Sequence, residues 1–365
     1  MSVTLREGDI DAFFKAPFEI YVASLGYVSP LKSDIRRMLD PARNPLWISG
    51  NPYRFWTAER DGKLLGRIVA LVHRQSNALH RTHRAQFGFF DCADDSEAAA
   101  ALLNAAAGFA RDQGQSELIG NFNLTAMQQA GIQTGKFGAQ AYTDMVVGPP
   151  YLPRLLESNG FGAVFPMTTF DINLSQVTVP SVNGFSPSDG FVFAPVEKRV
   201  FPERMDEARR VLNDGFAANP MFVPLTSAEF EFQASEMSAI LDPRLSSVLH
   251  YRGEPIGSVI CIPDLNGFLA ATRSRIGVAT PFHYLHYRLN RKRAVIIFYS
   301  VAQAWHGRGV MPAMLARTIK ALKGAGYERL GVTWIAEQNS ASLRQMERLG
   351  GQPLQHLHLF RKDVA

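Results

Sequence analysis

The sequence has 365 residues, of which 46% are apolar and 19% charged, and its formal net charge is +5 with an isoelectric point near 9.2. This length is long for one hydrophobic core and suits two domains of a globular protein. No apolar run approaches the ~20 residues of a membrane-spanning helix, and the first residues lack the apolar centre of a signal peptide. The sequence therefore predicts a cytoplasmic protein, and it offers no set of metal ligands.

The positive charge suits polyanionic ligands, among them CoA and anionic lipid. It is dense only at residues 288–293, which follow an aromatic run at residues 281–287. This segment is either a solvated loop or an amphipathic surface segment that contacts anionic lipid or a long acyl chain. Because no other basic stripe extends it, we expect no nucleic-acid partner.

The first half reads as an alternation of helices and strands. Its turns and periodicity predict helices at residues 11–21, 33–39 and 98–111, a hairpin at 60–69, and strands at 116–119 and 165–172. A long insertion follows the strand at 116–119. Its polar residues Asn121 and Asn123, with Tyr142, are either turn formers or the lining of an acceptor pocket.

The second half repeats the first. Gly62 and Gly66 of the first hairpin recur as Gly253 and Gly257, at one constant interval. The order of the elements that follow is also the same, which indicates one α/β module used twice. A segment rich in proline, serine and glycine, residues 176–190, predicts the linker between them. Extra residues in the second half, at 264–293, are expected in a loop.

A glycine loop is the most informative feature of the second half. A β-branched run at residues 294–301 leads through His306, Gly307, Arg308 and Gly309 into a helical pattern. The free amides of a first helical turn and the helix dipole favour a bound anion, and the glycines let the backbone approach it closely. This order of strand, loop and helix predicts a cradle for a pyrophosphate.

The loop resembles the pyrophosphate loop of the GNAT acyltransferase superfamily, which has the form Arg/Gln-x-x-Gly-x-Gly/Ala. Gly309 matches, whereas His306 and Met311 depart from the pattern. Asn339 followed by a helix that ends in Gly350-Gly351 resembles a second element of the family. Landmarks along nearly the whole chain are similar to those of a bacterial group with two GNAT modules.

The resemblance implies an α/β fold with mixed sheets in two tandem GNAT-fold modules. It implies an N-terminal module at residues 1–175, the linker at 176–190 and a C-terminal module at 191–365 that binds acyl-CoA. The first module has acidic residues 91–97 where the glycine loop would be. These would repel a pyrophosphate and suit a helix N-terminus, so we expect the first module to be degenerate.

The resemblance also implies the site residues. The residues expected to bind acetyl-CoA or another acyl-CoA are Ser300, Val301, His306, Gly307, Arg308, Gly309, Val310, Met311 and Asn339. Glu337, at the end of a strand, is the first candidate for the base that deprotonates an amine acceptor, and Tyr299 is the second. Glu337 is equally explained as a residue that pairs with an Arg or caps the following helix, and a Tyr in a core strand usually serves packing. The family's usual proton-donating Tyr is replaced by Met346.

The predicted function is transfer of an acetyl or longer acyl group from acyl-CoA to an amine in a ternary complex. Two alternatives remain open. One is a CoA-binding sensor or scaffold without catalysis, and the other is a lipid-amine or aminoacyl transferase related to tandem-GNAT ligases.

Overall fold

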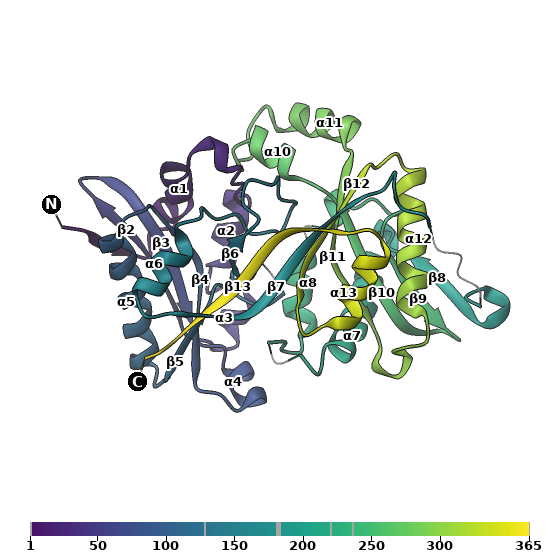
Figure 1. Ribbon diagram of the computed structural model, residues 1–365, viewed down its shortest axis with the longest axis horizontal. Helices are drawn as coiled ribbons and strands as arrows, with labels where there is room; N and C mark the ends of the chain where they lie inside the picture. Colours follow the sequence, from purple (N-terminus) through teal and green to yellow (C-terminus); the bar gives the residue numbers. More distant parts are fainter. Residues whose placement is uncertain (1, 128, 180–183, 220, 236, 365) are drawn as a thin grey trace. The chain divides into compact units, whose positions relative to one another are not determined.

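The computed structural model describes residues 2–127, 129–179, 184–219, 221–235 and 237–364 (Figure 1). Residues 180–183 of the predicted linker therefore lie outside the described residues. The chain forms two compact units, and each is assembled from separate stretches of sequence. The first contains Met1–Thr169, Asn266–Leu285 and Leu354–Ala365, and the second contains Phe170–Leu265 and His286–Pro353.

The first unit is built on a mixed sheet with the strand order β1-β2-β3-β4-β5-β13, and β6 also pairs with β13. The strands are β1 (Thr4–Glu7), β2 (Tyr53–Arg60), β3 (Lys63–Leu71), β4 (Arg84–Cys92), β5 (Glu117–Gly120), β6 (Ile132–Gly135) and β13 (Gln352–Asp363). Only β4 and β5 are parallel neighbours among the described pairs of this unit. The helices are α1 (Ile10–Ile20), α2 (Lys32–Met38), α3 (Pro45–Ile48), α4 (Arg74–His80), α5 (Ser96–Asp112), α6 (Leu152–Ser158) and α10 (Asn266–Ala271).

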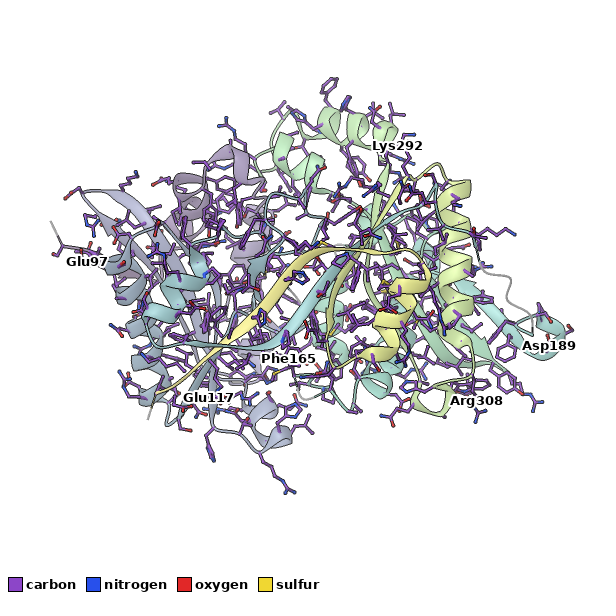
Figure 2. All side chains as sticks on the ribbon, viewed as in Figure 1. Glu97, Glu117, Phe165, Asp189, Lys292 and Arg308 are labelled. Atoms are coloured by element: carbon purple, nitrogen blue, oxygen red, sulfur yellow. The ribbon has the colours of Figure 1, made fainter. Side chains whose placement is uncertain are left out.

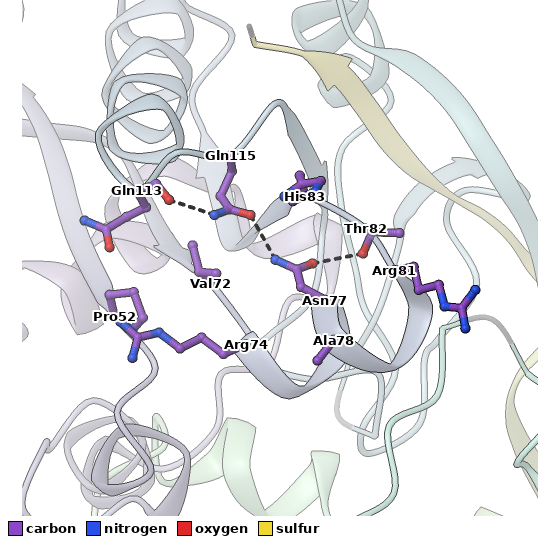
Figure 3. Close-up of a pocket in the computed structure, with 10 residues that line it drawn as sticks. All are labelled: Pro52, Val72, Arg74, Asn77, Ala78, Arg81, Thr82, His83, Gln113 and Gln115. Carbon is purple, nitrogen blue, oxygen red and sulfur yellow. Dashed lines mark hydrogen bonds between the residues drawn. The ribbon is translucent and has the colours of Figure 1, made fainter.

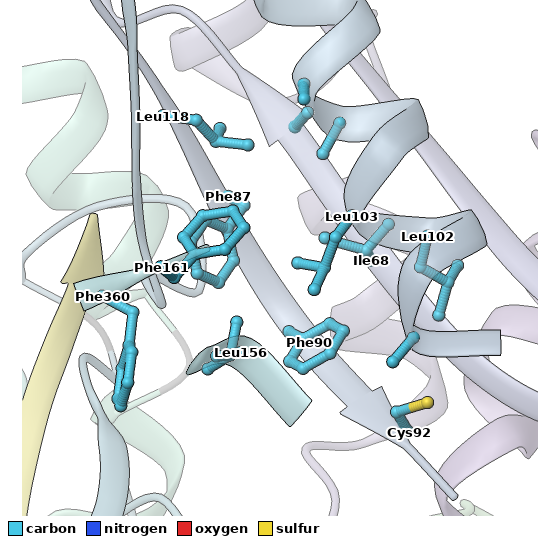
Figure 4. Packing of buried hydrophobic residues seen from close by; sticks show 14 of the residues in the cluster. Ile68, Phe87, Phe90, Cys92, Leu102, Leu103, Leu118, Leu156, Phe161 and Phe360 are labelled. Carbon is cyan, nitrogen blue, oxygen red and sulfur yellow. The ribbon is translucent and has the colours of Figure 1, made fainter. Parts of the chain in front are cut away.

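One hydrophobic core of the first unit lies between the sheet and α5, and a second contains Phe13 and Phe14 of α1. Leu102 and Leu103 of α5 are buried with Ile68 of β3 and Phe87 of β4 (Figure 4). The alanine-rich sequence of α5 favours a helix and lets it pack closely on the strands. This helix provides the crossover between the parallel strands β4 and β5.

The second unit repeats this plan. Its strands follow the order β12-β11-β10-β9-β8, and they are β8 (Phe191–Pro195), β9 (Ser247–Tyr251), β10 (Glu254–Pro263), β11 (Arg293–Val301) and β12 (Arg329–Ala336). Its helices are α7 (Phe201–Gly215), α8 (Ser227–Ala234), α9 (Met237–Ile240), α12 (Val310–Gly324) and α13 (Ser340–Arg348). Three elements have residues in both units: β7 (Gly162–Asn173), α11 (Thr280–Asn290) and β13, whose first two residues belong to the second unit.

The repeat predicted from the glycines is present in both units. In each, a hairpin is followed by a third antiparallel strand, a long helix and a strand parallel to the third. The parallel pairs are β4 with β5 and β11 with β12. The mixed α/β fold class predicted from the sequence is confirmed.

The last strand of the chain lies in the first unit. β13 runs antiparallel to β5, with Phe360 opposite Gly120, and Phe360 is buried in the core of that unit. Pairing between residues so distant in sequence has no local signal.

The insertion at residues 264–293 contains helices in addition to loop. Figure 1 shows α10 and α11 as neighbouring green helices outside the strands. No helix in the described part of the chain combines the length and the apolar character needed to cross a bilayer.

Candidate acyl-CoA site

The glycine loop ends directly at the start of α12. After β11 the chain makes a short 3-10 turn at Gln303–Trp305 and then turns through Gly307 and Gly309, whose φ angles are +74° and +79°. Such angles favour glycine, because a side chain would strain them. Gly309 is the N-cap of α12 and supplies no side-chain capping bond. The first amides of α12 have no acceptor within the helix, so they are available to an anion.

The side chains beside the loop are basic. The His306 ring lies with Nε2 2.8 Å from the carbonyl oxygen of Val301. The Arg308 guanidinium lies over the Trp305 ring, 5.3 Å from its centroid, and Arg308 is at the surface (Figure 2). A Cβ added at Gly309 would lie 3.7 Å from the Phe185 ring, an ordinary contact. The loop is therefore exposed and is not filled by packing side chains.

The parallel strands beside the loop separate before they end. Their paired register stops at Ile296 and Val332, although β11 continues to Val301 and β12 to Ala336. A register shift between β10 and β11 leaves Ile297 as an extra residue, which is a β-bulge. Beside it the Thr333 hydroxyl donates to the Ile297 carbonyl oxygen at 2.8 Å. A side-chain bond thus takes the place of the backbone ladder where the two strands begin to separate.

The residues predicted at the end of β11 face different neighbours. The Ser300 hydroxyl is buried and donates to the carbonyl oxygen of Val211 on α7 at 3.1 Å. The ring of Tyr299 is half-buried, and its hydroxyl is buried beside Ser342 of α13 without a hydrogen bond of normal geometry. Burial raises the pKa of Tyr299 to about 12, so the hydroxyl stays protonated at neutral pH.

The remaining predicted residues lie at the start of α13 or within the core. Glu337 and Asn339 are both exposed, after the end of β12. The Asn339 side chain is the N-cap of α13 and accepts the Ser342 amide at 3.1 Å. Met346 is fully buried in the core of the second unit, which makes it a packing residue.

The equivalent helix start in the first unit is closed. The Asp95 carboxylate caps α5 by accepting the Ala98 amide at 2.9 Å. Arg60 binds both Asp95 and Glu97, and its hydrogen bond to Asp95 lowers the pKa of that carboxyl. The amides and the local charge that an anion would use are therefore occupied by the protein's own carboxylates.

The space beside β4 is also filled. The chain after β5 stays bonded to β4, with the Phe89 amide donating to Asn123 Oδ1 at 2.8 Å and the Phe90 amide to Asn121 Oδ1 at 3.0 Å. A Cβ on Gly88 would lie 1.6 Å from the Phe122 carbonyl oxygen. Asn121 and Asn123 thus hold backbone together, and they also line a cavity of about 40 Å³ in the same unit. Tyr142 is buried.

A larger hollow of about 410 Å³ lies elsewhere in the first unit (Figure 3). Asn77, Thr82 and Gln115 line it; Asn77 donates to Gln115 and accepts from the Thr82 hydroxyl. It adjoins the start of β4 at Arg84 and the end of α5, whereas sites in α/β sheets gather at the carboxyl ends of parallel strands. We therefore do not assign it to acyl transfer.

Sequence reasoning missed three features of these regions. The bulge at Ile297 and the role of Thr333 depend on strand pairing, which a single threonine does not signal. Asp144 follows the insertion of the first half, and burial raises the pKa of its carboxyl to about 7.

Within the described ranges no three His, Cys, Asp or Glu side chains gather as a metal site.

Comparisons with known proteins agree with the fold. Residues 216–350 match the model of the acetyltransferase (GNAT) family. Protein YghO of Escherichia coli (strain K12) is 24% identical over 383 residues, which cover 99% of this chain and 94% of that protein. A bacterial ceramide synthase of Caulobacter vibrioides is 23% identical over 370 residues, covering 98% and 95%.

Two solved structures share the fold along the whole chain. A tandem GNAT protein from the clavulanic acid biosynthesis pathway has a TM-score of 0.60 at 11% identity, covering 100% of this chain and 99% of that one. A GCN5-related N-acetyltransferase from Sphaerobacter thermophilus has a TM-score of 0.58 at 14% identity, covering 99% and 96%. The resemblance read from the motifs is confirmed: residues 216–350 match the GNAT family, and the chain along its whole length has the fold of tandem GNAT proteins.

Proposed function

We propose that the C-terminal module, residues 191–365, binds acyl-CoA at residues 307–311 and transfers the acyl group to an amine. The observation that carries this proposal is the contrast between two equivalent helix starts. α5 is capped by the Asp95 carboxylate, whereas α12 begins at Gly309 without a side-chain cap. An open, glycine-lined helix N-terminus between basic side chains favours a diphosphate.

The separation of β11 from β12 suits the pantetheine arm of CoA. Beyond Ile296 the backbone of β11 is no longer paired with β12, so amides of this strand can polarise a thioester carbonyl. We assign this role to the stretch that ends at Ser300 and Val301. The Asn339 side chain, at the start of α13, borders the same end of β12.

The transfer itself needs a base and an acid. The amine nitrogen attacks the thioester carbon, the C–S bond breaks, and an amide and a thiolate result. We assign the proton of the amine to Glu337, an exposed carboxylate at the end of β12. We assign protonation of the thiolate to Tyr299, because it is a phenol on the part of β11 that is no longer paired with β12, whereas Met346 has no proton to give.

We further propose that the acceptor is a long-chain amine and the donor a long-chain acyl-CoA. A relative over nearly the full length of the chain carries the name ceramide synthase, and a ceramide is the amide of a fatty acid and a long-chain amino alcohol. Cytoplasmic acyl-CoA would supply the donor. Because Asp95 caps the start of α5, we assign no CoA to the first module. We assign acceptor binding to it instead.

Release of free thiol tests the proposal directly. The protein is incubated with acetyl-CoA or palmitoyl-CoA and a panel of amines that runs from small polyamines to long-chain amino alcohols. We expect turnover with palmitoyl-CoA and a long-chain amino alcohol, and loss of turnover in Gly309→Asp. CoA binding without turnover on any amine would refute catalysis and favour a sensor, and turnover restricted to small amines would refute the acceptor class.

A further inference from the structure

The helix α11 presents its apolar side chains to solvent. Phe282, Leu285 and Leu289 stand at spacings of three and four residues, which places them on one face. Their exposed fractions are 73%, 56% and 75%. Their neighbours Tyr284 and Tyr287, on the opposite face, are less exposed. The usual arrangement of a surface helix, with its apolar stripe buried, is therefore reversed in α11.

The apolar surface continues into the turn before α11. Ile276 is 70% exposed, and Val278 is fully exposed. An exposed apolar surface of this extent on a globular protein marks an interaction site. Scattered single exposed residues would carry no such meaning.

The segment is nevertheless held in place. The Ser274 hydroxyl donates to the carbonyl oxygen of Ser29 at 2.6 Å, and the Lys32 amide donates to the Ser274 carbonyl at 2.9 Å. The ring of Phe268 on α10 meets that of Tyr284 edge-on, with centroids 5.8 Å apart. These hydrogen bonds and the ring contact thus anchor the segment that carries the apolar face of α11.

Positive charge flanks this face. The sequence contains no Asp or Glu from residue 265 to residue 327. Arg273 and Arg288 are exposed and form no ion pair within the described residues. Lys292, at the end of the segment (Figure 2), binds Glu328 at 3.0 Å. A helix with an exposed apolar face and flanking cations is typical of proteins that lie on anionic bilayers.

We infer that α11 and the preceding turn dock on the surface of an anionic phospholipid bilayer. Phe282, Leu285 and Leu289 enter the boundary between headgroups and acyl chains, and Arg273 and Arg288 contact the lipid phosphates. The inference concerns where the protein works and does not require the proposed transfer reaction. Docking would place the protein beside substrates held in a bilayer.

Sedimentation with vesicles tests the inference. Vesicles of phosphatidylcholine with about one-third phosphatidylglycerol are compared with vesicles of phosphatidylcholine alone, at low and at high salt. We expect binding to the anionic vesicles that falls several-fold in high salt, because screening weakens surface charge contacts. The double variant Phe282→Ser/Leu289→Ser should lower the partition coefficient at least ten-fold, and Arg288→Gln should lower it only on anionic vesicles.

Matched controls separate docking from other effects. Leu79→Ser changes an apolar residue that is 51% exposed on α4, and it should bind vesicles as the unaltered chain does. Absence of vesicle binding at low salt, or equal binding by the double variant, overturns the inference. If light scattering shows a dimer that the double variant converts to a monomer, a second copy covers the face and the bilayer is excluded. Thiol release with detergent-dissolved substrates is measured in parallel, so failure of the transfer proposal is seen separately.

Discussion

Charge placed at Gly309 should weaken CoA binding with little effect on the fold. The position has φ +79°, and a Cβ there would meet only the Phe185 ring at an ordinary distance. Asp and Asn tolerate such backbone angles better than other side chains, so each substitution should lower stability by about 1 kcal/mol. Asp and Asn have nearly the same shape, so their difference isolates the charge.

The size of the effect follows from the distance of the charge to the diphosphate. Two unit charges about 4 Å apart repel by about 4 kcal/mol near a protein surface and about 1 kcal/mol in bulk water. At 1.4 kcal/mol for each ten-fold, Gly309→Asp should bind CoA between about five-fold and about 1,000-fold more weakly than Gly309→Asn. Isothermal titration with CoA at low salt measures both.

The control is Gly253→Asp, in the hairpin between β9 and β10. Gly253 has φ +89° with nothing within 4 Å, so it carries the same backbone strain and the same new charge in the same unit. It should lose stability as Gly309→Asp does and keep its affinity for CoA. Equal affinities of the Asp and Asn variants at position 309 would contradict the assignment of the loop to a diphosphate.

Three further changes test other residues. Tyr299→Phe should lower kcat by about 100-fold and leave the Kd for CoA unchanged in titrations; an unchanged kcat would remove Tyr299 as the acid. Glu337→Gln should slow turnover and leave the Kd for CoA unchanged, whereas an unchanged rate would leave it a structural residue. Asp144→Asn acts on stability: the folded-state pKa of Asp144, about 7, lies above the ordinary value of 3.8, so ionisation destabilises the fold as pH rises from about 4 to about 7. The variant should be more stable than the unaltered chain at pH 8, by at most about 4 kcal/mol, with no difference near pH 4; equal urea unfolding at both pH values would show that water reaches the carboxyl.

Local signals explain what the sequence could predict. Gly62 and Gly253 occupy turns with positive φ. Each such turn fixes the pairing of the two strands that it joins. The same holds for Gly309, whose position before an apolar helix pattern marked the loop. The acidic stretch of the first half predicts a helix start that rejects an anion, and Asp95 does cap α5.

Features that depend on distant residues had no such signal. The insertion at 264–293 has an apolar pattern, but the apolar face of α11 is exposed to solvent. Hydrophobic periodicity does not show whether the apolar face of a helix is buried. The bulge at Ile297 depends on the register between β10 and β11. The raised pKa of Asp144 depends on its burial, which the sequence around it does not reveal.

The position of β13 has a consequence for the order in which the chain folds. The first unit needs residues from Leu354 onward to complete its sheet, and a ribosome makes these residues after the stretches that form the second unit. Until they emerge, the edge of β5 remains without its neighbour, and an unpaired edge invites association with other chains. A newly made N-terminal half must therefore wait for the remainder of the polypeptide, and dividing the gene between the two modules would not yield two self-sufficient proteins.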